Sequence, residues 1–362
     1  MSDQNLADTW NTYLEAAVCE QCDRSYLLPS GALPVQCPYC FQATLTGMAE
    51  DTVAELYSRP PELIVPFSLS NENVTANIQQ FTRRIWFAPK DLTPENLQTR
   101  LQRVYLPMWL VDSDVRATWQ AEVGFDYNVV SHQDSFDQNR GGWVSREVTE
   151  TRIRWEPRVG RLTRTYANTT APALEEHFTL QKRLGQFNFN AAQPYAADGI
   201  ANSFVRLPNR LRTDAWPDAI PPLQTSAAEE CRRACNADHF RHFRWKADYD
   251  NLNWTLLLLP MFTTYYLDDD ETPQPVLIHG QSGRISGPQR ASMKRAQQTA
   301  LIILGIAIVL FVLSLIVGGV GLLVPSPLLA LGIIGLIIAI GIGLLAIAPI
   351  VIAWQFNRSN KT

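Results

Sequence analysis

A long apolar stretch without charged residues dominates the C-terminal part of this 362-residue chain. No Asp, Glu, Lys or Arg occurs between Arg295 and Arg358. Residues 299–324 and 328–354 would each form an apolar helix about 40 Å long, and the hydrocarbon core of a bilayer is about 30 Å thick. Prolines 325 and 327 interrupt any helix that would join the two. The sequence therefore predicts a C-terminal hairpin of two transmembrane helices rather than two buried core helices, because both segments are apolar on every side and long enough to cross a bilayer.

Basic residues on both sides of this stretch indicate its orientation. The turn between the predicted helices carries no charge, whereas six cations lie before the first helix or after the second: Arg284, Arg290, Lys294, Arg295, Arg358 and Lys361. Lys and Arg are enriched on the cytoplasmic side of membrane proteins. We therefore expect a two-span protein of a prokaryotic inner membrane with both termini in the cytoplasm. No secretory signal is expected, because acidic residues occupy the start of the chain. A signal peptide would instead have a basic N-terminal region followed by an apolar segment.

Four cysteines form the most specific motif of the chain. Cys19, Cys22, Cys37 and Cys40 make two C-x2-C pairs, and residues 23–36 between them can form a short hairpin. Four thiolates complete the tetrahedral coordination of Zn²⁺ and leave no open position. We predict a structural zinc ion in a small β zinc ribbon, with iron or a redox-active dithiol as the alternatives. Thiolate ligands also indicate a reducing compartment.

The remaining composition divides the chain into regions. We expect a polar lead-in and the zinc ribbon in residues 1–45, and a linker in residues 46–62. A cytoplasmic α+β domain in residues 63–290 precedes the transmembrane helices.

Periodicity predicts the elements of this α+β domain. Ser70 caps a helix over residues 71–86, and Thr93 followed by Pro94 begins a second helix. Residues 157–160 are expected to turn the chain between two strands of a hairpin. The other predictions are strands at 104–111, 115–125, 147–155, 161–169, 252–267 and 275–280, and a helix at 226–243.

Arginines crowd the predicted hairpin, interleaved with Trp155 and Tyr166: Arg152, Arg154, Arg158, Arg161 and Arg164. One interpretation is a phosphate-binding strip. We favour a solvated strand face, because three glutamates dilute the positive charge: Glu147, Glu150 and Glu156. The net charge of the chain is −4, which provides no general attraction for nucleic acid.

Two further clusters contain residue types that could carry chemistry. Cys231, Cys235, His239 and His242 would share one helical face, but they extend too far along a helix for one ion to reach all four. We interpret them as a buried helix face rather than a second metal site. His279 to Gly283 superficially resembles a serine nucleophile elbow, but Arg284 stands where the motif requires glycine. We expect this segment to turn the chain after strand 275–280.

Several motifs, taken in order, resemble a bacterial family of zinc-ribbon membrane proteins. They follow the cysteine pairs and precede the apolar stretch: residues 84–89 (RIWFAP), 105–109 (YLPMW), 154–157 (RWEP), 259–261 (LPM) and 280–283 (GQSG). Members are largely uncharacterised, and some are named after primosomal replication factor Y or a helicase through the ribbon alone. His279 and Ser282 differ from the Asn and Thr expected in that family. The resemblance implies a scaffold near stomatin-like or phage-shock-type membrane proteins.

The function predicted from these features is recruitment without catalysis. No nucleotide-binding loop, H-E-x-x-H motif or dinucleotide fingerprint occurs in the sequence, so neither helicase activity nor another enzymatic activity is expected. We expect a membrane-anchored adaptor or scaffold whose partners are the lipid bilayer and a membrane-associated protein. The alternative is a membrane-tethered nucleic-acid-binding protein that uses the ribbon and the arginine-rich hairpin.

Overall fold

The computed structural model describes residues 10–48, 60–83, 85–137, 141–323 and 327–359. The chain forms two compact units. Unit 1 comprises Met1–Leu106, Phe178–Leu207 and Leu258–Thr362, and unit 2 comprises Pro107–His177 and Pro208–Leu257. Residues 63–290, treated above as one domain, thus contribute to both units. Most of the predicted lead-in and linker, and most of the predicted turn between the two apolar helices, lie outside the described residues.

The described residues contain strands, α-helices and two short 3-10 helices. The strands are β1 (Leu14–Cys19), β2 (Arg24–Pro29), β3 (Thr46–Gly47), β4 (Leu63–Ile64), β5 (Gln102–Asp137), β6 (Gly142–Pro172), β7 (Gln193–Pro194), β8 (Phe204–Arg206), β9 (His239–Leu267), β10 (Pro273–His279) and β11 (Ile285–Ser286). The helices are α3 (Asn71–Arg83), α4 (Pro94–Thr99), α5 (His177–Leu184), η1 (Phe189–Ala191), η2 (Ala197–Ile200), α6 (Arg212–Ala234), α7 (Met293–Leu323), α8 (Leu328–Leu345) and α9 (Ala348–Ser359).

A mixed sheet runs through unit 1 in the strand order β11-β10-β9-β5-β8-β2-β1-β3. The short strand β8 pairs in parallel with β5 and antiparallel with β2. Tyr26 and Leu27 of β2 lie opposite Arg206 and Val205 of β8. The cysteine-bearing segment, which contains β1, β2 and β3, is therefore part of the same sheet as the rest of unit 1.

Helices α3 and α4 pack against β9 and β10 and form the core of unit 1. The core includes Val74, Ile78, Phe81, Ile85, Leu92, Leu97, Phe262, Tyr266, Val276 and Ile278. The Ser70 hydroxyl accepts the N–H of Asn73 at 3.2 Å, and the Thr93 hydroxyl accepts the N–H of Asn96 at 3.2 Å. Both hydroxyls satisfy free donors at a helix N-terminus, which confirms the two predicted helix starts.

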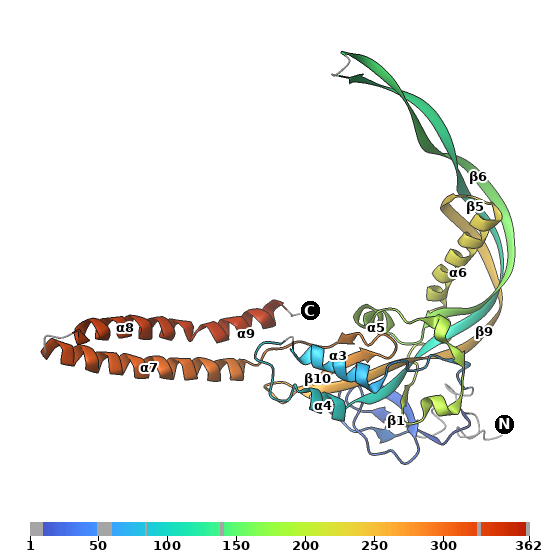
Figure 1. The fold of residues 1–362 in the computed structure, drawn as a ribbon. Helices are drawn as coiled ribbons and strands as arrows, with labels where there is room; N and C mark the ends of the chain where they lie inside the picture. Colours follow the sequence, from blue (N-terminus) through green and yellow to red (C-terminus); the bar gives the residue numbers. More distant parts are fainter. Residues whose placement is uncertain (1–9, 49–59, 84, 138–140, 324–326, 360–362) are drawn as a thin grey trace. The chain divides into compact units, whose positions relative to one another are not determined.

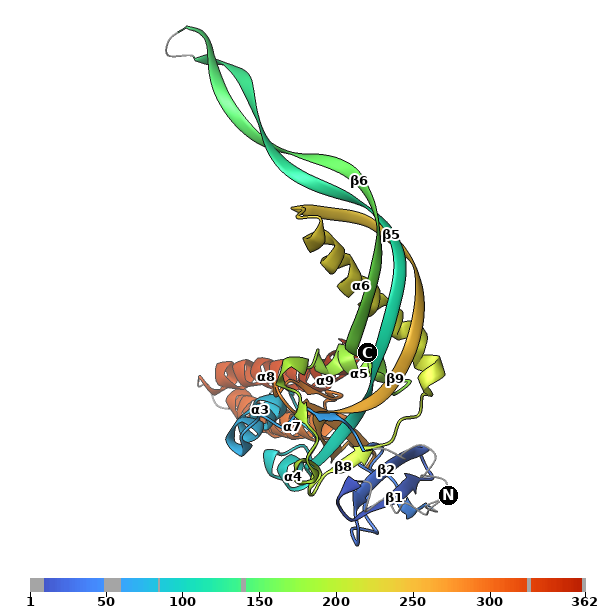
Figure 2. The same ribbon diagram turned by 90° about the vertical axis from the view of Figure 1, so that its right-hand side faces the viewer.

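Unit 2 contains one long antiparallel hairpin rather than the four shorter strands predicted at 104–111, 115–125, 147–155 and 161–169. Strands β5 and β6 pair from Met108↔Pro172 to Asp137↔Gly142, and Figure 2 shows them side by side. The predicted turn at residues 157–160 is therefore wrong, and these residues lie inside β6. Gly160 lies opposite Trp119, and a Cβ at Gly160 would come within 2.8 Å of that indole. Among the described strands β6 pairs only with β5, and an edge strand tolerates Pro157 because an edge N–H needs no partner.

Helix α6 packs on this hairpin and corrects the helix predicted at 226–243. It begins earlier, includes three prolines, and buries a stripe with a spacing of four residues: Ala215, Ala219, Leu223, Ala227 and Cys231. Leu223 and Ala227 of this stripe contact Val115, Ala117 and Tyr166, and Figure 2 shows α6 beside β5 and β6. Asn236 adopts a left-handed backbone with φ 49° just after the helix, which is a common way for a helix to end. The chain then enters β9 at His239.

Two apolar helical segments end the chain, as predicted. Met293–Leu322 and Leu328–Ser359 are long and apolar enough to cross a membrane, and α7 and α8 lie side by side (Figure 1). A Cβ at Gly332 would lie 2.5 Å from the Gly318 Cα, so these glycines permit the close approach of the two helices. The second segment is not one continuous helix. It breaks between α8 and α9 just before Pro349, because proline cannot continue the preceding hydrogen-bond ladder.

Candidate metal centre

The first cysteine pair lies at the turn between β1 and β2. Cys19 is the last residue of β1, and Cys22 lies in the turn that leads to Arg24. Asp23 follows with φ 55°, and its N–H donates to the Cys19 carbonyl at 2.8 Å. The left-handed residue reverses the chain so that both sulfurs lie on the same side of the turn.

The second cysteine pair repeats this geometry. Phe41 follows Cys40 with φ 55°, and its N–H donates to the Cys37 carbonyl at 3.2 Å. Each C-x2-C pair is thus closed by a left-handed residue directly after its second cysteine. The spacing predicted the two turns, but it did not predict which residue closes each of them, because neither is a glycine.

The two turns bring all four sulfurs together. The Sγ atoms of Cys19, Cys22, Cys37 and Cys40 lie within 4.8 Å of one another. The Cys19–Cys40 and Cys22–Cys37 distances are 3.6 and 3.7 Å. A tetrahedron with metal–sulfur bonds of about 2.3 Å has edges of about 3.8 Å, whereas a disulfide bond measures about 2.05 Å. The four thiols are free and can bind one metal ion.

Burial and backbone donors act in opposite directions on these thiols. Burial raises the pKa of Cys37, although the N–H groups of Tyr39 and Cys40 donate to its sulfur. Burial also tends to raise the pKa of Cys40, but N–H groups of Gln42 and Ala43 donate to that sulfur and the net shift is downward. Such N–H donors favour the thiolate, which is the form that binds metal.

An arginine lies beside the cluster. Burial raises the pKa of Cys22, and a hydrogen bond from Arg24 opposes that shift. The Arg24 guanidinium also lies 3.2 Å from the centroid of the Tyr39 ring. Four thiolates around a divalent cation carry a net charge of −2, so a neighbouring guanidinium stabilises the filled site.

The second turn is attached to β9 of unit 1. The Thr263 hydroxyl donates to the Pro38 carbonyl at 2.9 Å and is buried. The Phe41 ring stacks on Tyr265 with centroids 4.6 Å apart. Sequence analysis missed Thr263 and Tyr265, because they lie far along the chain from the cysteines and carry no local signal. These contacts hold the metal centre on the sheet.

The histidines of the second predicted cluster do not join its cysteines. Cys231 and Cys235 lie at the end of α6, whereas His239 and His242 belong to β9. His239 contacts Asp126 at 2.7 Å, and His242 approaches Glu122 at 3.5 Å. The predicted shared helical face is therefore wrong, although Cys231 is buried as expected. These four residues form no metal-ligating group in the described part of the chain.

Most of the arginines on β6 are paired with acids. Glu150 binds Arg152, Glu156 binds both Arg154 and Arg158, and Glu230 binds Arg164. All of these side chains are at least partly exposed, so the ion pairs contribute little to stability. Arg146 and Arg161 are the exceptions on this strand, because no acid among the described residues lies within ion-pair distance of either.

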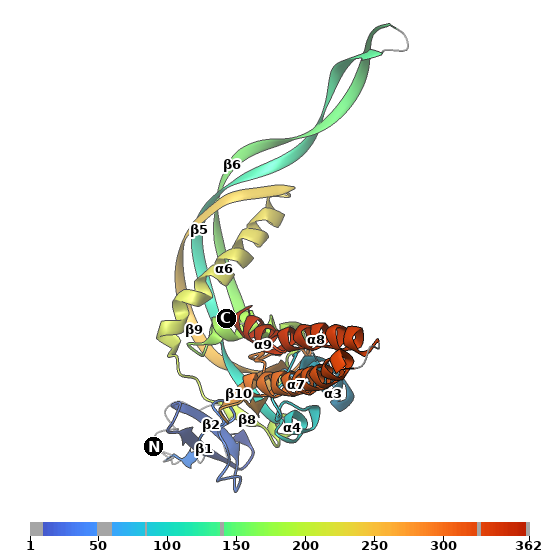
Figure 3. The same ribbon diagram turned by 90° about the vertical axis from the view of Figure 1, so that its left-hand side faces the viewer.

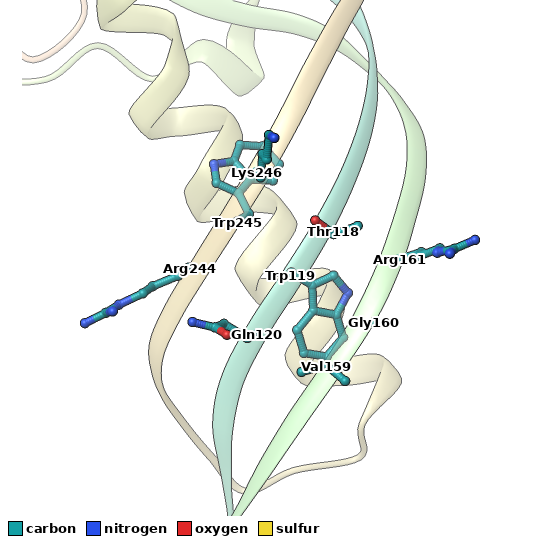
Figure 4. A pocket seen from close by; sticks show the side chains of 9 residues that line it. All are labelled: Thr118, Trp119, Gln120, Val159, Gly160, Arg161, Arg244, Trp245 and Lys246. Atoms are coloured by element: carbon teal, nitrogen blue, oxygen red, sulfur yellow. The ribbon is translucent and has the colours of Figure 1, made fainter.

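Arg161 lines a pocket of about 590 Å³ in unit 2 (Figure 4). Its other cations, Arg244 and Lys246 on β9, also have no acidic partner among the residues described, and Trp119 and Trp245 complete its aromatic lining. Figure 4 shows the Arg161 and Arg244 side chains extending to opposite sides of the three strands. They do not converge on one small anion.

The His279 to Gly283 segment turns the chain between β10 and β11, as predicted. His279 is buried, and its Nδ1 accepts the N–H groups of Gln281 and Ser282 at 3.1 and 3.2 Å. Gly283 has φ 71°, and its N–H donates to the His279 carbonyl. Burial lowers the pKa of His279. With Nδ1 already accepting two backbone donors, the imidazole stabilises a turn and is not arranged to activate Ser282.

Comparison with protein-family models, with curated proteins and with solved structures returned no match.

Proposed function

We propose that this protein is a membrane-anchored adaptor without catalytic activity. Its C-terminal helices insert into the inner membrane of a prokaryote, and its cytoplasmic units recruit a partner protein. The observation that carries the proposal is an unsupported part of the β5–β6 hairpin, residues 126–137 and 142–153, which we call the arm. The resemblance to bacterial zinc-ribbon membrane proteins agrees with this function and suggests a stomatin-like or phage-shock-type partner.

The arm lacks the supporting elements of the rest of unit 2. Strand β9 begins at His239, whose ring contacts Asp126 at the base of the arm. Beyond this point β5 and β6 pair only with each other among the described strands, and the hairpin continues past β9 (Figures 2 and 3). A two-stranded hairpin is marginally stable in water. An arm of this length is therefore suited to gain stability from a partner.

One face of the arm exposes a row of apolar side chains. The strand register places Val130, Trp143 and Ile153 on this face, because they belong to the pairs Val130↔Thr149, Phe136↔Trp143 and Asp126↔Ile153. All three are exposed. Tyr127 is also exposed but lies on the opposite face. The three apolar side chains are spread along one face of the arm, which suits contact with an extended partner.

The recruitment test compares the two faces of the arm. Crosslinking of the wild type in intact membranes should capture the partner, and the crosslinked protein is then identified. Val130→Glu combined with Ile153→Glu should abolish this crosslink. Tyr127→Glu is the control, because it places a negative charge on the opposite face. Equal crosslinking by the wild type and the double variant would contradict the assignment of the binding face.

We further propose that the metal is zinc and that its role is structural. Four sulfur ligands suit zinc and complete its shell, so the ion has no position for substrate. Metal analysis of purified, reduced protein should find about one zinc per chain. Cys37→Ser should lose the metal and unfold the ribbon, because binding and folding are coupled in such units. The control variant Cys235→Ser, which lies outside the cluster, should retain the metal. Iron, or no metal in the wild type, would overturn this assignment.

The second candidate function is nucleic-acid binding. It is favoured by one observation, the three cations of the unit 2 pocket that have no acidic partner among the described residues: Arg161, Arg244 and Lys246. A polyanion could contact side chains that point apart, and Trp119 and Trp245 could stack on bases. Binding of DNA or RNA that weakens steeply with added salt, and that an Arg244→Glu variant loses, would favour this function over the adaptor.

A further inference from the structure

The two ends of the apolar hairpin are joined at their base. Asn357 of α9 forms two hydrogen bonds with the backbone of Ala291: its Oδ1 accepts the N–H at 2.7 Å, and its Nδ2 donates to the carbonyl at 2.9 Å. Arg295 on α7 and Arg358 on α9 are the charged residues that border the apolar stretch. In a membrane these residues would mark the level where hydrocarbon gives way to headgroups.

A loop from the N-terminal half of unit 1 is attached to this base. It comprises residues 85–90, and we call it the Trp86 loop. The Phe87 carbonyl accepts the N–H of Ser292 at 2.7 Å, and the Ala88 carbonyl accepts Nη1 of Arg295 at 2.8 Å. The Phe87 ring packs against the alanine cluster formed by the two helical segments: Ala291, Ala296 and Ala353. The loop is therefore held at the same level as the border cations.

The loop presents a tryptophan to the outside. Phe87 adopts φ 53°, a backbone conformation that is rare for a bulky side chain. Phe87 turns inward, whereas Trp86 remains 66% exposed. Trp354 on α9 is 53% exposed, and the Arg358 guanidinium lies 5.3 Å from its ring centroid. Two exposed tryptophans thus flank the base of the apolar hairpin.

We infer that the Trp86 loop is a third membrane contact, in which the Trp86 indole lies in the headgroup region of the bilayer. Tryptophan is enriched at this depth because its ring is apolar and its N–H is polar. Arg83 just before the loop and Lys90 at its end are both exposed and suit the phosphate groups of lipids. The loop would fix the orientation of unit 1 on the membrane surface. This inference rests on the proposed membrane insertion of the apolar helices.

The test measures the quenching of individual tryptophans by lipid. The full chain is reconstituted in phosphatidylcholine vesicles with or without bromine on the acyl chain near the headgroup. Subtracting the fluorescence of the Trp86→Phe variant from that of the wild type gives the fluorescence of Trp86 alone. We expect brominated lipid to lower this difference signal. Phe at an exposed position should not disturb folding, and circular dichroism checks this.

Two matched variants make the outcomes distinguishable. Trp354→Phe isolates a tryptophan of the apolar segment, and Trp10→Phe isolates one that is fully buried in unit 1. Quenching of Trp354 and Trp86 but not of Trp10 supports the inference. Quenching of Trp354 alone overturns the inference and leaves membrane insertion intact. No quenching of Trp354 overturns membrane insertion, and the inference fails with it.

Discussion

Asp23 and Phe41 occupy equivalent backbone positions in the two cysteine turns, but their surroundings differ. Both have φ 55°, which costs an ordinary side chain free energy relative to glycine. Asp23 is exposed, whereas Phe41 is buried against Tyr265. The same substitution should therefore have opposite effects at these two positions.

Asp23→Gly should stabilise the metal centre by about 0.5–1 kcal/mol, because glycine adopts the left-handed conformation without a steric penalty. Phe41→Gly should destabilise it by about 3 kcal/mol or more, because the lost ring leaves a cavity in the core. The measurement is the temperature at which the metal is released to a chelating dye. A lower release temperature for Asp23→Gly would contradict the role given to the left-handed residue.

His279 should make unit 1 sensitive to acid. Its Nδ1 accepts two backbone N–H groups only while the imidazole is neutral, and burial holds its pKa below the usual value of about 6.5. A depressed histidine pKa contributes stability that is present in full above the unfolded-state pKa. This contribution is lost as the pH falls toward the pKa of the folded state.

The experiment compares the unfolding temperatures of the wild type and His279→Asn at pH 7 and pH 5. Asparagine offers a neutral oxygen that can accept the same two N–H groups at either pH. The wild type should lose more stability between the two pH values than the variant. Because acid also weakens thiolate–metal bonds in both proteins, only the difference between them reports on His279. Equal losses would show that the turn does not depend on a neutral imidazole.

Among the elements, the apolar hairpin depends on which glycines lie between its helices. A Cβ at Gly332 would collide with the backbone of Gly318, whereas a Cβ at Gly341 would meet no atom within 4 Å. Gly332→Val should therefore destabilise the packing of α7 on α8 by about 1–3 kcal/mol. Gly341→Val is the matched control and should have little effect. Unfolding temperatures in detergent measure both, and equal effects would contradict a specific helix contact.

The corrected elements share a physical cause. The predicted turn at 157–160 relied on a local Pro and Gly signal, but Gly160 lies under Trp119 of the neighbouring strand. Helix α6 contains three prolines, which disfavour a helix interior, but its Leu223 and Ala227 pack on β5 and β6. In both cases contacts with distant residues determined the structure. Local propensity is a weak guide wherever such contacts decide.

At the scale of the whole molecule, the predicted orientation leads to a labelling pattern. The structure brings acids near two of the six cations that flank the apolar stretch: Arg290 lies 3.5 Å from Asp268, and the backbone N–H of Lys294 donates to the Asp269 carboxylate at 3.0 Å. The orientation rule counts Lys and Arg rather than net charge, so the prediction of cytoplasmic termini is unchanged.

An impermeant maleimide should label Ser326→Cys in intact cells but not Ser359→Cys. Native Cys235 precedes the apolar helices, lies outside the metal cluster and is partly exposed, so it provides an internal control that reacts only after permeabilisation. Labelling of Ser359→Cys in intact cells would reverse the orientation.

The sequence by itself determined the features that rest on local chemistry. The charge-free stretch identified the apolar helices, the spacing of the cysteines identified a metal-binding cluster, and Ser70 and Thr93 identified two helix starts. Each signal lies within one segment, because apolar length, ligand spacing and capping need no information from elsewhere in the chain.

Only the tertiary structure decided what holds these segments together. The cysteine turns attach to Thr263 and Tyr265 on β9, and the Trp86 loop attaches to Ser292 and Arg295 at the start of α7. In the hairpin of unit 2, Trp119 covers Gly160 where a turn was predicted. All of these contacts join residues that are distant in sequence. Such packing depends on the shapes of two side chains and the distance between them, and it leaves no periodic pattern in the sequence around either residue.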